Sequence, residues 1–429
     1  MLKLKKLLVP DKVIRQALIY VIFCTGLLII VTQFVDLPFL FPRWDEKANS
    51  ILSFNLKDNY YPPGAALALI PFLWAGSASP IAVYFYYALS ALVYFYICQK
   101  IGKNKFKLIA LIALPANAYL TWLCITSADQ VIELLFLLLF AFYGLSNKFL
   151  PCLLFGWLLC LTRPAYWAAF IIIILLYKID RKKVIRFLLT KSAALLLLII
   201  TLLGNNFLFN SPSLATSGSQ TFLYSHNKYL YLSLPLFDID VFLKNHMQPS
   251  EFIVNNEFSG IADPRIKAGL ISIKENPKNF ILAEIQKVNA YFFSVQKVPN
   301  LPGEYYLSND AKSIIIGNER LSWVIVLGNA AYFIYKVIWM IFFALALSYL
   351  FFFWRIGKKF EDSEIYLLVP FFSGILPGLI FYVESRFKTC TELLIMPFLM
   401  LTLRNLFEFI DEHKNNNSIN NIFSNNNIS

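Results

Sequence analysis

The stretch VIRQALIYVIFCTGLLIIVTQFV, from Val13 to Val35, decides the fold class. A helix needs about 20 predominantly apolar residues to cross a bilayer, and similar apolar runs recur along all 429 residues of the chain. Hydrophobic residues make up 58% of the sequence and charged residues 15%, whereas soluble domains are about 45–50% apolar and about 25% charged. We therefore expect an integral membrane protein, and an ordinary water-soluble enzyme is excluded. The first run is too long for a signal-peptide core and should remain as a span.

Positive charge separates the two predicted sides of the membrane. The net charge is +12, and the excess of Lys and Arg lies in three short segments between apolar runs, at 1–15, 99–107 and 178–191. Cytoplasmic loops carry such an excess, so these segments are predicted to lie inside. Because the basic residues do not gather in one patch, we expect no nucleic acid partner.

With these segments inside, the chain is predicted to be an all-α membrane protein with about ten transmembrane helices, interfacial helices and one large outer loop region. Both termini then lie inside. The predicted spans are about 14–35, 80–98, 108–126, 130–146, 149–163, 165–177, 191–209, 337–354, 364–383 and 388–403. The predicted regions are an N-terminal transmembrane module (1–209) with a catalytic first outer loop (36–79), an outer-face loop region with amphipathic helices (210–322), C-terminal transmembrane helices (323–404) and a disordered cytoplasmic tail (405–429).

Three apolar or amphipathic segments do not fit a simple span. Residues 64–76 are too few to cross, so we expect a re-entrant or interfacial helix. Residues 278–295 carry apolar residues at helical spacing, which predicts an amphipathic helix on the membrane surface. The run 323–353 would be about 46 Å long as a helix, well over a bilayer core of about 30 Å. Because Lys336 lies in its middle, we expect an interfacial helix before this residue and a span after it.

Cysteine and histidine give no sign of a metal or disulfide framework. The six cysteines all fall in apolar runs without a C-x-x-C pair, and the three histidines have no neighbouring ligand at metal spacing. We read the cysteines as small buried hydrophobic residues.

Acidic residues stand at two predicted outer span ends. Asp45 and Glu46 follow the first span, and Asp129 opens the fourth, with Glu133 one turn later on the same helix face. Such acids could act as a general base or bind a divalent cation. Asp45 could equally be a solvated loop acid, and Asp129 could merely offset the helix dipole.

Two further charged sites fall on the same predicted face. Arg163 lies in Leu161-Thr162-Arg163-Pro164, where proline ends one helix and a tight hairpin to the next helix is predicted. Arg163 could hold a phosphate or extend to the lipid headgroups. The turn Glu384-Ser385-Arg386-Phe387-Lys388 could serve a ligand or form only local ion pairs. All four charged sites are predicted on the outer face of the membrane. This indicates a functional site, because placing ionisable side chains near lipid costs free energy.

In these motifs the chain resembles the polytopic GT-C glycosyltransferases, which include protein mannosyltransferases, the aminoarabinose transferase of lipid A and lipopolysaccharide galacturonosyltransferases. The resemblance covers about residues 14–404. It rests on six motifs in order: Asp45-Glu46 with Ala48 and Ile51-Leu52, Tyr61-Pro62-Pro63-Gly64, Asp129 with Leu134-Leu135-Phe136, Leu161-Thr162-Arg163-Pro164, Glu275-Asn276-Pro277 with Phe280 and Lys287, and Glu384-Ser385-Arg386-Phe387 with Pro397.

The resemblance implies transfer of a sugar from a polyprenyl-phosphate donor to a glycan, lipid or protein acceptor of the cell envelope, with inversion. It implies a multi-pass protein of the bacterial inner membrane, with its site on the periplasmic face. None of the motifs requires a cofactor, and the resemblance allows a divalent metal ion without requiring one. The implied roles are catalytic for Asp45, Glu46 and Asp129, donor phosphate-binding for Arg163, Arg386 and Lys388, and substrate-pocket for Tyr60, Tyr61 and Glu384.

Two other functions stay open at this stage. A transporter or flippase for a lipid-linked saccharide would carry ionisable residues at mid-membrane depth, and Lys336 is one such residue. An envelope polysaccharide polymerase or ligase would use Arg and His in the long outer loop, where His226 and His246 have no partner motif.

Overall fold

The computed structural model describes most of the chain. The described residues are 11–34, 42–53, 63–75, 79–102, 104–126, 128–177, 184–209, 222, 226, 264–293, 306–307, 314–315, 323–355, 362–380 and 385–425. For some residues within these helices only the backbone is described.

The described residues are helical, apart from a two-residue antiparallel pairing of β1 (Tyr306–Leu307) with β2 (Ile314–Ile315). The first part contains α1 (Asp11–Phe34), α2 (Pro42–Leu52), α3 (Gly64–Leu69), the 3-10 helix η1 (Ile70–Ala75), α4 (Ser79–Gln99), α5 (Asn104–Ala116), α6 (Ala118–Thr126), α7 (Ala128–Leu145) and α8 (Phe149–Thr162). The remainder contains η2 (Pro164–Tyr166), α9 (Trp167–Leu176), α10 (Val184–Phe209), α15 (Pro264–Glu275), α16 (Pro277–Phe293), α17 (Trp323–Arg355), α18 (Asp362–Ile380) and α19 (Ser385–Asn425).

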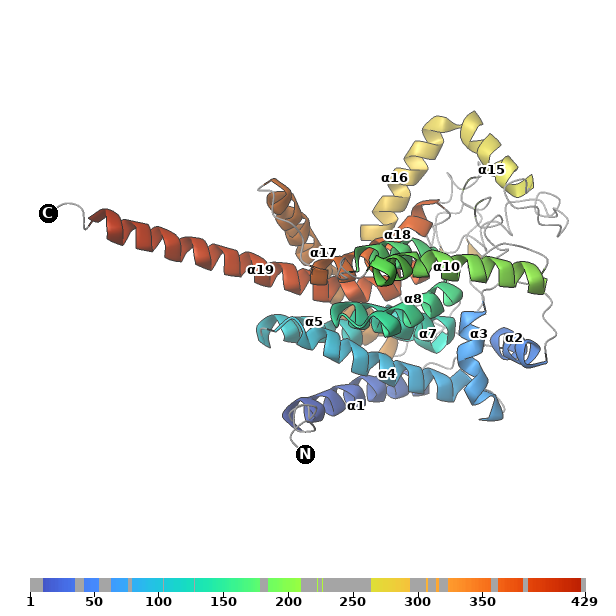
Figure 1. The fold of residues 1–429 in the computed structure, drawn as a ribbon. Coiled ribbons are helices and arrows are strands. Elements are labelled where there is room, and N and C mark those ends of the chain that lie inside the picture. Colours follow the sequence, from blue (N-terminus) through green and yellow to red (C-terminus); the bar gives the residue numbers. More distant parts are fainter. Residues whose placement is uncertain are drawn as a thin grey trace.

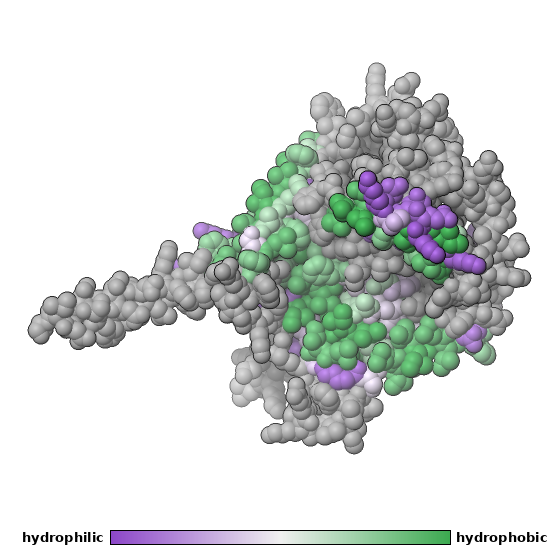
Figure 2. Space-filling view, turned by 90° about the horizontal axis from the view of Figure 1, so that it is seen from above, coloured by the Kyte–Doolittle hydropathy of each residue, from purple (hydrophilic) through white to green (hydrophobic). Residues whose placement is uncertain are grey.

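Several helices are long and apolar enough to cross a membrane, which confirms the prediction of an all-helical membrane protein at this level. Among the described residues, five helices meet this test, and α5 with α6 would make a sixth if this pair, bent by 44°, is one span. Figure 2 shows broad hydrophobic areas on the outside of the molecule, as expected for surface that faces lipid. The five segments are 12–32, 81–99, 190–207, 330–349 and 389–408.

The helices form a bundle with two distinct ends. α7 packs against α4 and α8, α1 packs against α4, and α18 packs against α19. Figure 1 shows both chain termini at one end of this bundle and α2 with α3 at the other. We call these the terminal end and the α2–α3 end.

Basic residues gather at the terminal end. Lys100 follows α4, and burial, together with the positive charge of Lys148, lowers the pKa of Lys100. Arg404 of α19 donates a hydrogen bond from Nη1 to the carbonyl oxygen of Ile101 at 2.7 Å. Lys191 of α10 binds the carbonyl oxygen of Tyr177 at 2.6 Å, at the carboxyl end of α9. A cation there satisfies carbonyl groups that the helix leaves open.

The predicted division of residues 323–353 at Lys336 is wrong, because α17 is one continuous helix. The prediction assumed that a charge in an apolar run must reach water. Instead, the Lys336 Nζ lies 2.8 Å from an oxygen of Glu392 in α19 and 4.3 Å from the ring centre of Trp339. A partner 56 residues away thus removes the reason for a break.

The chain end also differs from the prediction of a disordered tail over 405–429. α19 continues through Asn425. Its first part is buried among the other helices, and each further turn adds backbone hydrogen bonds to an existing helix, which costs far less than starting a new one.

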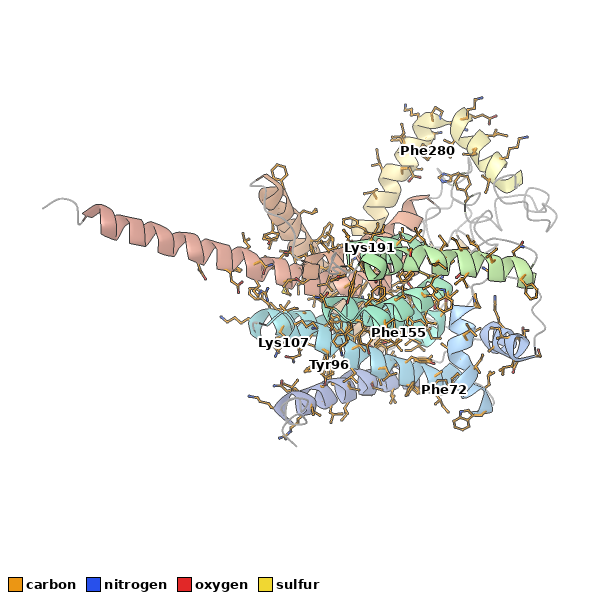
Figure 3. The ribbon with its side chains drawn as sticks, viewed as in Figure 1. Phe72, Tyr96, Lys107, Phe155, Lys191 and Phe280 are labelled. Carbon is orange, nitrogen blue, oxygen red and sulfur yellow. The ribbon has the colours of Figure 1, made fainter. Side chains whose placement is uncertain are left out.

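The segment that precedes α17 lies largely outside the described residues, so the predicted outer loop of 210–322 is seen only in part. The helix predicted at 278–295 is confirmed as α16, and α15 comes before it without having been predicted. The ring centre of the buried His226 lies 4.5 Å from that of Phe222 and 5.7 Å from that of Phe280 in α16. Figure 3 marks Phe280 beside this contact, well away from the bundle core.

Candidate functional site

The candidate site begins with four side chains, Asp129, Glu133, Arg163 and Tyr166, which we call the Arg163 cluster. Arg163 donates from Nε to Glu133 at 2.8 Å and from Nη2 to Asp129 at 2.9 Å. The Tyr166 hydroxyl donates to the other oxygen of Glu133 at 2.7 Å. One guanidinium therefore bridges two carboxylates.

Local sequence explains why these groups meet. Pro164 cannot continue α8, so Arg163 takes an extended backbone conformation, with φ −139° and ψ 106°, as the helix ends. The short helix η2 then returns the chain, so that Tyr166 also faces α7. On α7, Asp129 and Glu133 are four residues apart and share one face. The predicted break at Arg163-Pro164 is thus confirmed.

Exposure differs sharply within the Arg163 cluster. The side chain of Arg163 is 20% exposed, whereas those of Asp129 and Glu133 are 8% and 1% exposed. Of these three side chains, that of Arg163 is therefore the most accessible. Removing one partner of such a buried pair typically costs about 3–5 kcal/mol, because the other charge is left uncompensated.

Gly64, the last residue of Tyr61-Pro62-Pro63-Gly64, packs directly on the turn that carries Arg163. A Cβ atom on Gly64 would lie 2.5 Å from the backbone nitrogen of Thr162 and 2.6 Å from the carbonyl carbon of Leu161. No side chain fits in this space. The requirement for glycine here follows from the close contact between α3 and the end of α8.

The first acidic motif lies on α2, next to this contact. α2 packs on α3 and η1, and Ala48 provides a fully buried face of the helix. Glu46 is exposed. Asp45 is placed on α2 by its backbone, and its side chain lies outside the described set.

The final motif opens α19, which starts beside α7. The Cys390 thiol lies 3.5 Å from the carbonyl oxygen of Gln130 and 3.7 Å from its side-chain oxygen. Arg386 is one turn before Cys390, and Asp129 is adjacent to Gln130. The backbone therefore brings the start of α19 near the Arg163 cluster. Only the backbone of Arg386 and Lys388 is described, and Tyr60, Tyr61 and Glu384 lie outside the described residues.

A second buried charge pair was not predicted as part of a site. Lys336 and Glu392 are 0% and 1% exposed, and Glu392 follows Cys390 by two residues. The signal in the sequence was one charge in each of two apolar runs, but nothing in the sequence paired them. In the Arg163 cluster, Glu133 was noted only as a neighbour of Asp129 on one helix face, and Tyr166, whose hydroxyl donates to Glu133, was not predicted.

The described residues contain no group of three or more His, Cys, Asp or Glu side chains able to hold a metal ion. Asp129 and Glu133, which could offer carboxylate oxygens, already face the guanidinium of Arg163. This donor set alone does not fit a divalent cation, which prefers several anionic or neutral oxygens without a competing cation.

Comparison with known proteins gives no match: no family model, no curated protein and no solved structure matches the chain.

Proposed function

We propose that the chain is a membrane glycosyltransferase of the GT-C type, which moves a sugar from a polyprenyl-phosphate donor to a cell-envelope glycan, lipid or protein. One observation carries the proposal. Gly64, Arg163 and the start of α19 come from three of the resembling motifs, spread over more than 300 residues, yet their backbones converge around the amino-terminal turn of α7. A lipid-borne phosphosugar needs such a site at a membrane surface.

The proposed topology has ten crossings, with the terminal end in the cytoplasm. α8 and α9 are short for full spans. In the proposed topology each of them is one crossing, and together they form the tight hairpin around Arg163. The basic residues of the terminal end support this orientation by the positive-inside rule. The α2–α3 end would then face the periplasm of a bacterial inner membrane, together with the outer loop of 210–322.

The proposed reaction is a single displacement at the anomeric carbon. Asp45 accepts the proton of an acceptor hydroxyl, whose oxygen forms a bond to that carbon. The bond from the carbon to the phosphate oxygen breaks, and the polyprenyl phosphate leaves with the bonding electrons. One displacement inverts the anomeric configuration. Glu46 would orient the acceptor, and Tyr60, Tyr61 and Glu384 would line the pocket.

Electrostatics suggest how the phosphate-binding work is divided. The Nε and Nη2 atoms of Arg163 already donate to Glu133 and Asp129, so we do not assign the main phosphate contacts to this guanidinium. We assign the main contacts to Arg386 and Lys388, with Arg163 as an additional donor that its two carboxylates keep in place. A planar guanidinium suits this task, since it can bind phosphate oxygens in pairs.

Asp45→Asn tests the catalytic assignment. The variant removes the base and keeps the size of the side chain, so we expect the transferred sugar to be lost from envelope glycolipids and glycoproteins measured by mass spectrometry. Asp411→Asn is the matched control, because Asp411 is exposed on the part of α19 that leaves the bundle. An unchanged product with Asp45→Asn, at equal protein level, would remove the proposal.

The Lys336–Glu392 pair favours one rival, a flippase for a lipid-linked saccharide, since buried ion pairs also mark transport pathways. Detergent-solubilised protein separates the two functions. A transferase still forms the glycosylated product when no membrane divides two compartments, whereas a flippase forms none. A polymerase or ligase is recognised in the same assay by products that carry many sugar units instead of one.

A further inference from the structure

A groove of about 500 Å³ lies on the side of the bundle, between α1, α4 and α5. This volume falls within the range of about 300–1,000 Å³ that is usual for small-molecule sites. The groove is near the terminal end, away from the Arg163 cluster. Figure 3 marks Lys107, one of its lining residues, close to the end where both termini lie.

The lining of the groove changes from polar to apolar along the helices. Lys107 is in the first turn of α5, Gln99 is the last residue of α4, and Gln16 is in the second turn of α1. Further along α1 the lining consists of Ile19 and Phe23, which are exposed toward the bilayer side. The polar groups are thus at the membrane–water boundary, and the apolar ones extend toward the membrane interior.

The polar end contains a donor that the described residues do not satisfy. The Lys107 Nζ donates to the side-chain oxygen of Gln99 at 3.3 Å. The amide nitrogen of Gln99 is buried and has no hydrogen-bond partner in the described part of the chain. This nitrogen has almost no accessible surface, so the group available to a ligand in the groove is the Lys107 ammonium, which the side-chain oxygen of Gln99 holds in place.

Charge around the groove favours an anion. Lys12 and Arg15 are exposed on α1 near the polar end of the groove, and Asp11, at the start of α1, is the acidic residue on the three helices that form it. Basic residues at the cytoplasmic surface attract anionic lipids. The chemistry that matches the groove is therefore a phosphate at one end and a hydrocarbon chain at the other.

We propose that this groove binds one anionic glycerophospholipid from the leaflet at the terminal end. Its phosphate lies against Lys107, which Gln99 holds in place, and one acyl chain lies along Ile19, Phe23 and Leu108. The site does not depend on the proposed glycosyl transfer, since it uses none of the residues assigned to that reaction.

Native mass spectrometry of the full chain in detergent tests the site, with phosphatidylglycerol and phosphatidylcholine of identical acyl chains as probes. Wild-type protein is expected to retain phosphatidylglycerol in preference. Lys107→Gln should weaken this retention about tenfold, the effect of one charge-assisted hydrogen bond. Lys105→Gln is the matched control, because Lys105 is exposed and does not line the groove, and it should retain the lipid as wild type does.

Two further variants keep the proposal testable if Lys107→Gln folds poorly. Gln99→Leu keeps the lysine and removes the oxygen that positions its ammonium group, so it should lower phosphatidylglycerol retention severalfold. Leu108→Trp fills the apolar part and should lower retention of the same lipid, with helicity unchanged. Equal retention of both lipids by the wild type would indicate bulk lipid and overturn the proposal. So would a Lys105→Gln loss as large as that of Lys107→Gln, or full retention by Gln99→Leu and Leu108→Trp.

Discussion

At the scale of single residues, Arg163 is the most strongly constrained charge in the candidate site. Its two hydrogen bonds to different carboxylates come from separate nitrogen atoms of a rigid guanidinium, whereas the donors of an ammonium group all lie on one atom and do not match this spacing. We expect Arg163→Lys to lower the unfolding free energy in detergent by about 1.5–3 kcal/mol. Arg163→Ala should cost more, about 3–5 kcal/mol, because both buried carboxylates then lose the guanidinium that bridges them. Thermal unfolding of both variants checks this order, and equal losses would contradict it.

Gly64 offers a second residue-scale prediction. Gly64→Ala places a methyl group against the backbone of Leu161 and Thr162, and overpacking of this kind costs about 1–3 kcal/mol. The turn that carries Arg163 must shift in response, so activity should fall together with stability. Gly204→Ala is the control, since open space surrounds Gly204, and alanine in a helix is favoured over glycine by up to about 1 kcal/mol. Similar unfolding temperatures for the two variants would count against the described contact.

At the scale of elements, α17 and α19 are joined by the buried pair Lys336–Glu392. Lys336→Met and Glu392→Met should each destabilise the protein by about 3–5 kcal/mol, because one buried charge remains. The double variant Lys336→Met/Glu392→Met should be less destabilised than either single variant. Glu408→Gln is a control at the exposed i,i+4 pair with Arg404, where we expect less than about 0.5 kcal/mol. Additive losses in a double-mutant cycle would show that the two groups do not interact.

Elements that depend on neighbouring residues can be predicted from sequence, and elements that depend on distant contacts such as Lys336–Glu392 cannot. Apolar length and proline predicted α4, the short α3–η1 segment and the hairpin at Arg163-Pro164, because each depends on neighbouring residues. The continuity of α17 depends on Glu392, 56 residues away, and the extension of α19 depends on the buried part that precedes it. Periodicity carries no information on such distant partners.

At the scale of the whole molecule, the sequence could predict which motifs belong to the candidate site but not how they contact one another. The charge distribution predicted a common face for Asp45, Asp129, Arg163 and Arg386. The structure brings the backbones of the last three segments together and puts α2 beside α3. That Asp129 and Arg163 form an ion pair, and that Glu133 shares it, depends on the tertiary packing of α7 against α8, across 30 to 34 residues.

The central claim is that one outward-facing site is assembled from both halves of the chain, at the end opposite the termini. Labelling of single cysteines in intact cells with a membrane-impermeant thiol reagent tests it directly, and the six native cysteines are buried, which keeps the background low. Glu46→Cys on α2 and Ser385→Cys at the start of α19 should both be labelled from outside, whereas Lys105→Cys at the terminal end should be labelled only after permeabilisation. Labelling of Glu46→Cys and Ser385→Cys from opposite sides, or of Lys105→Cys in intact cells, would contradict the account.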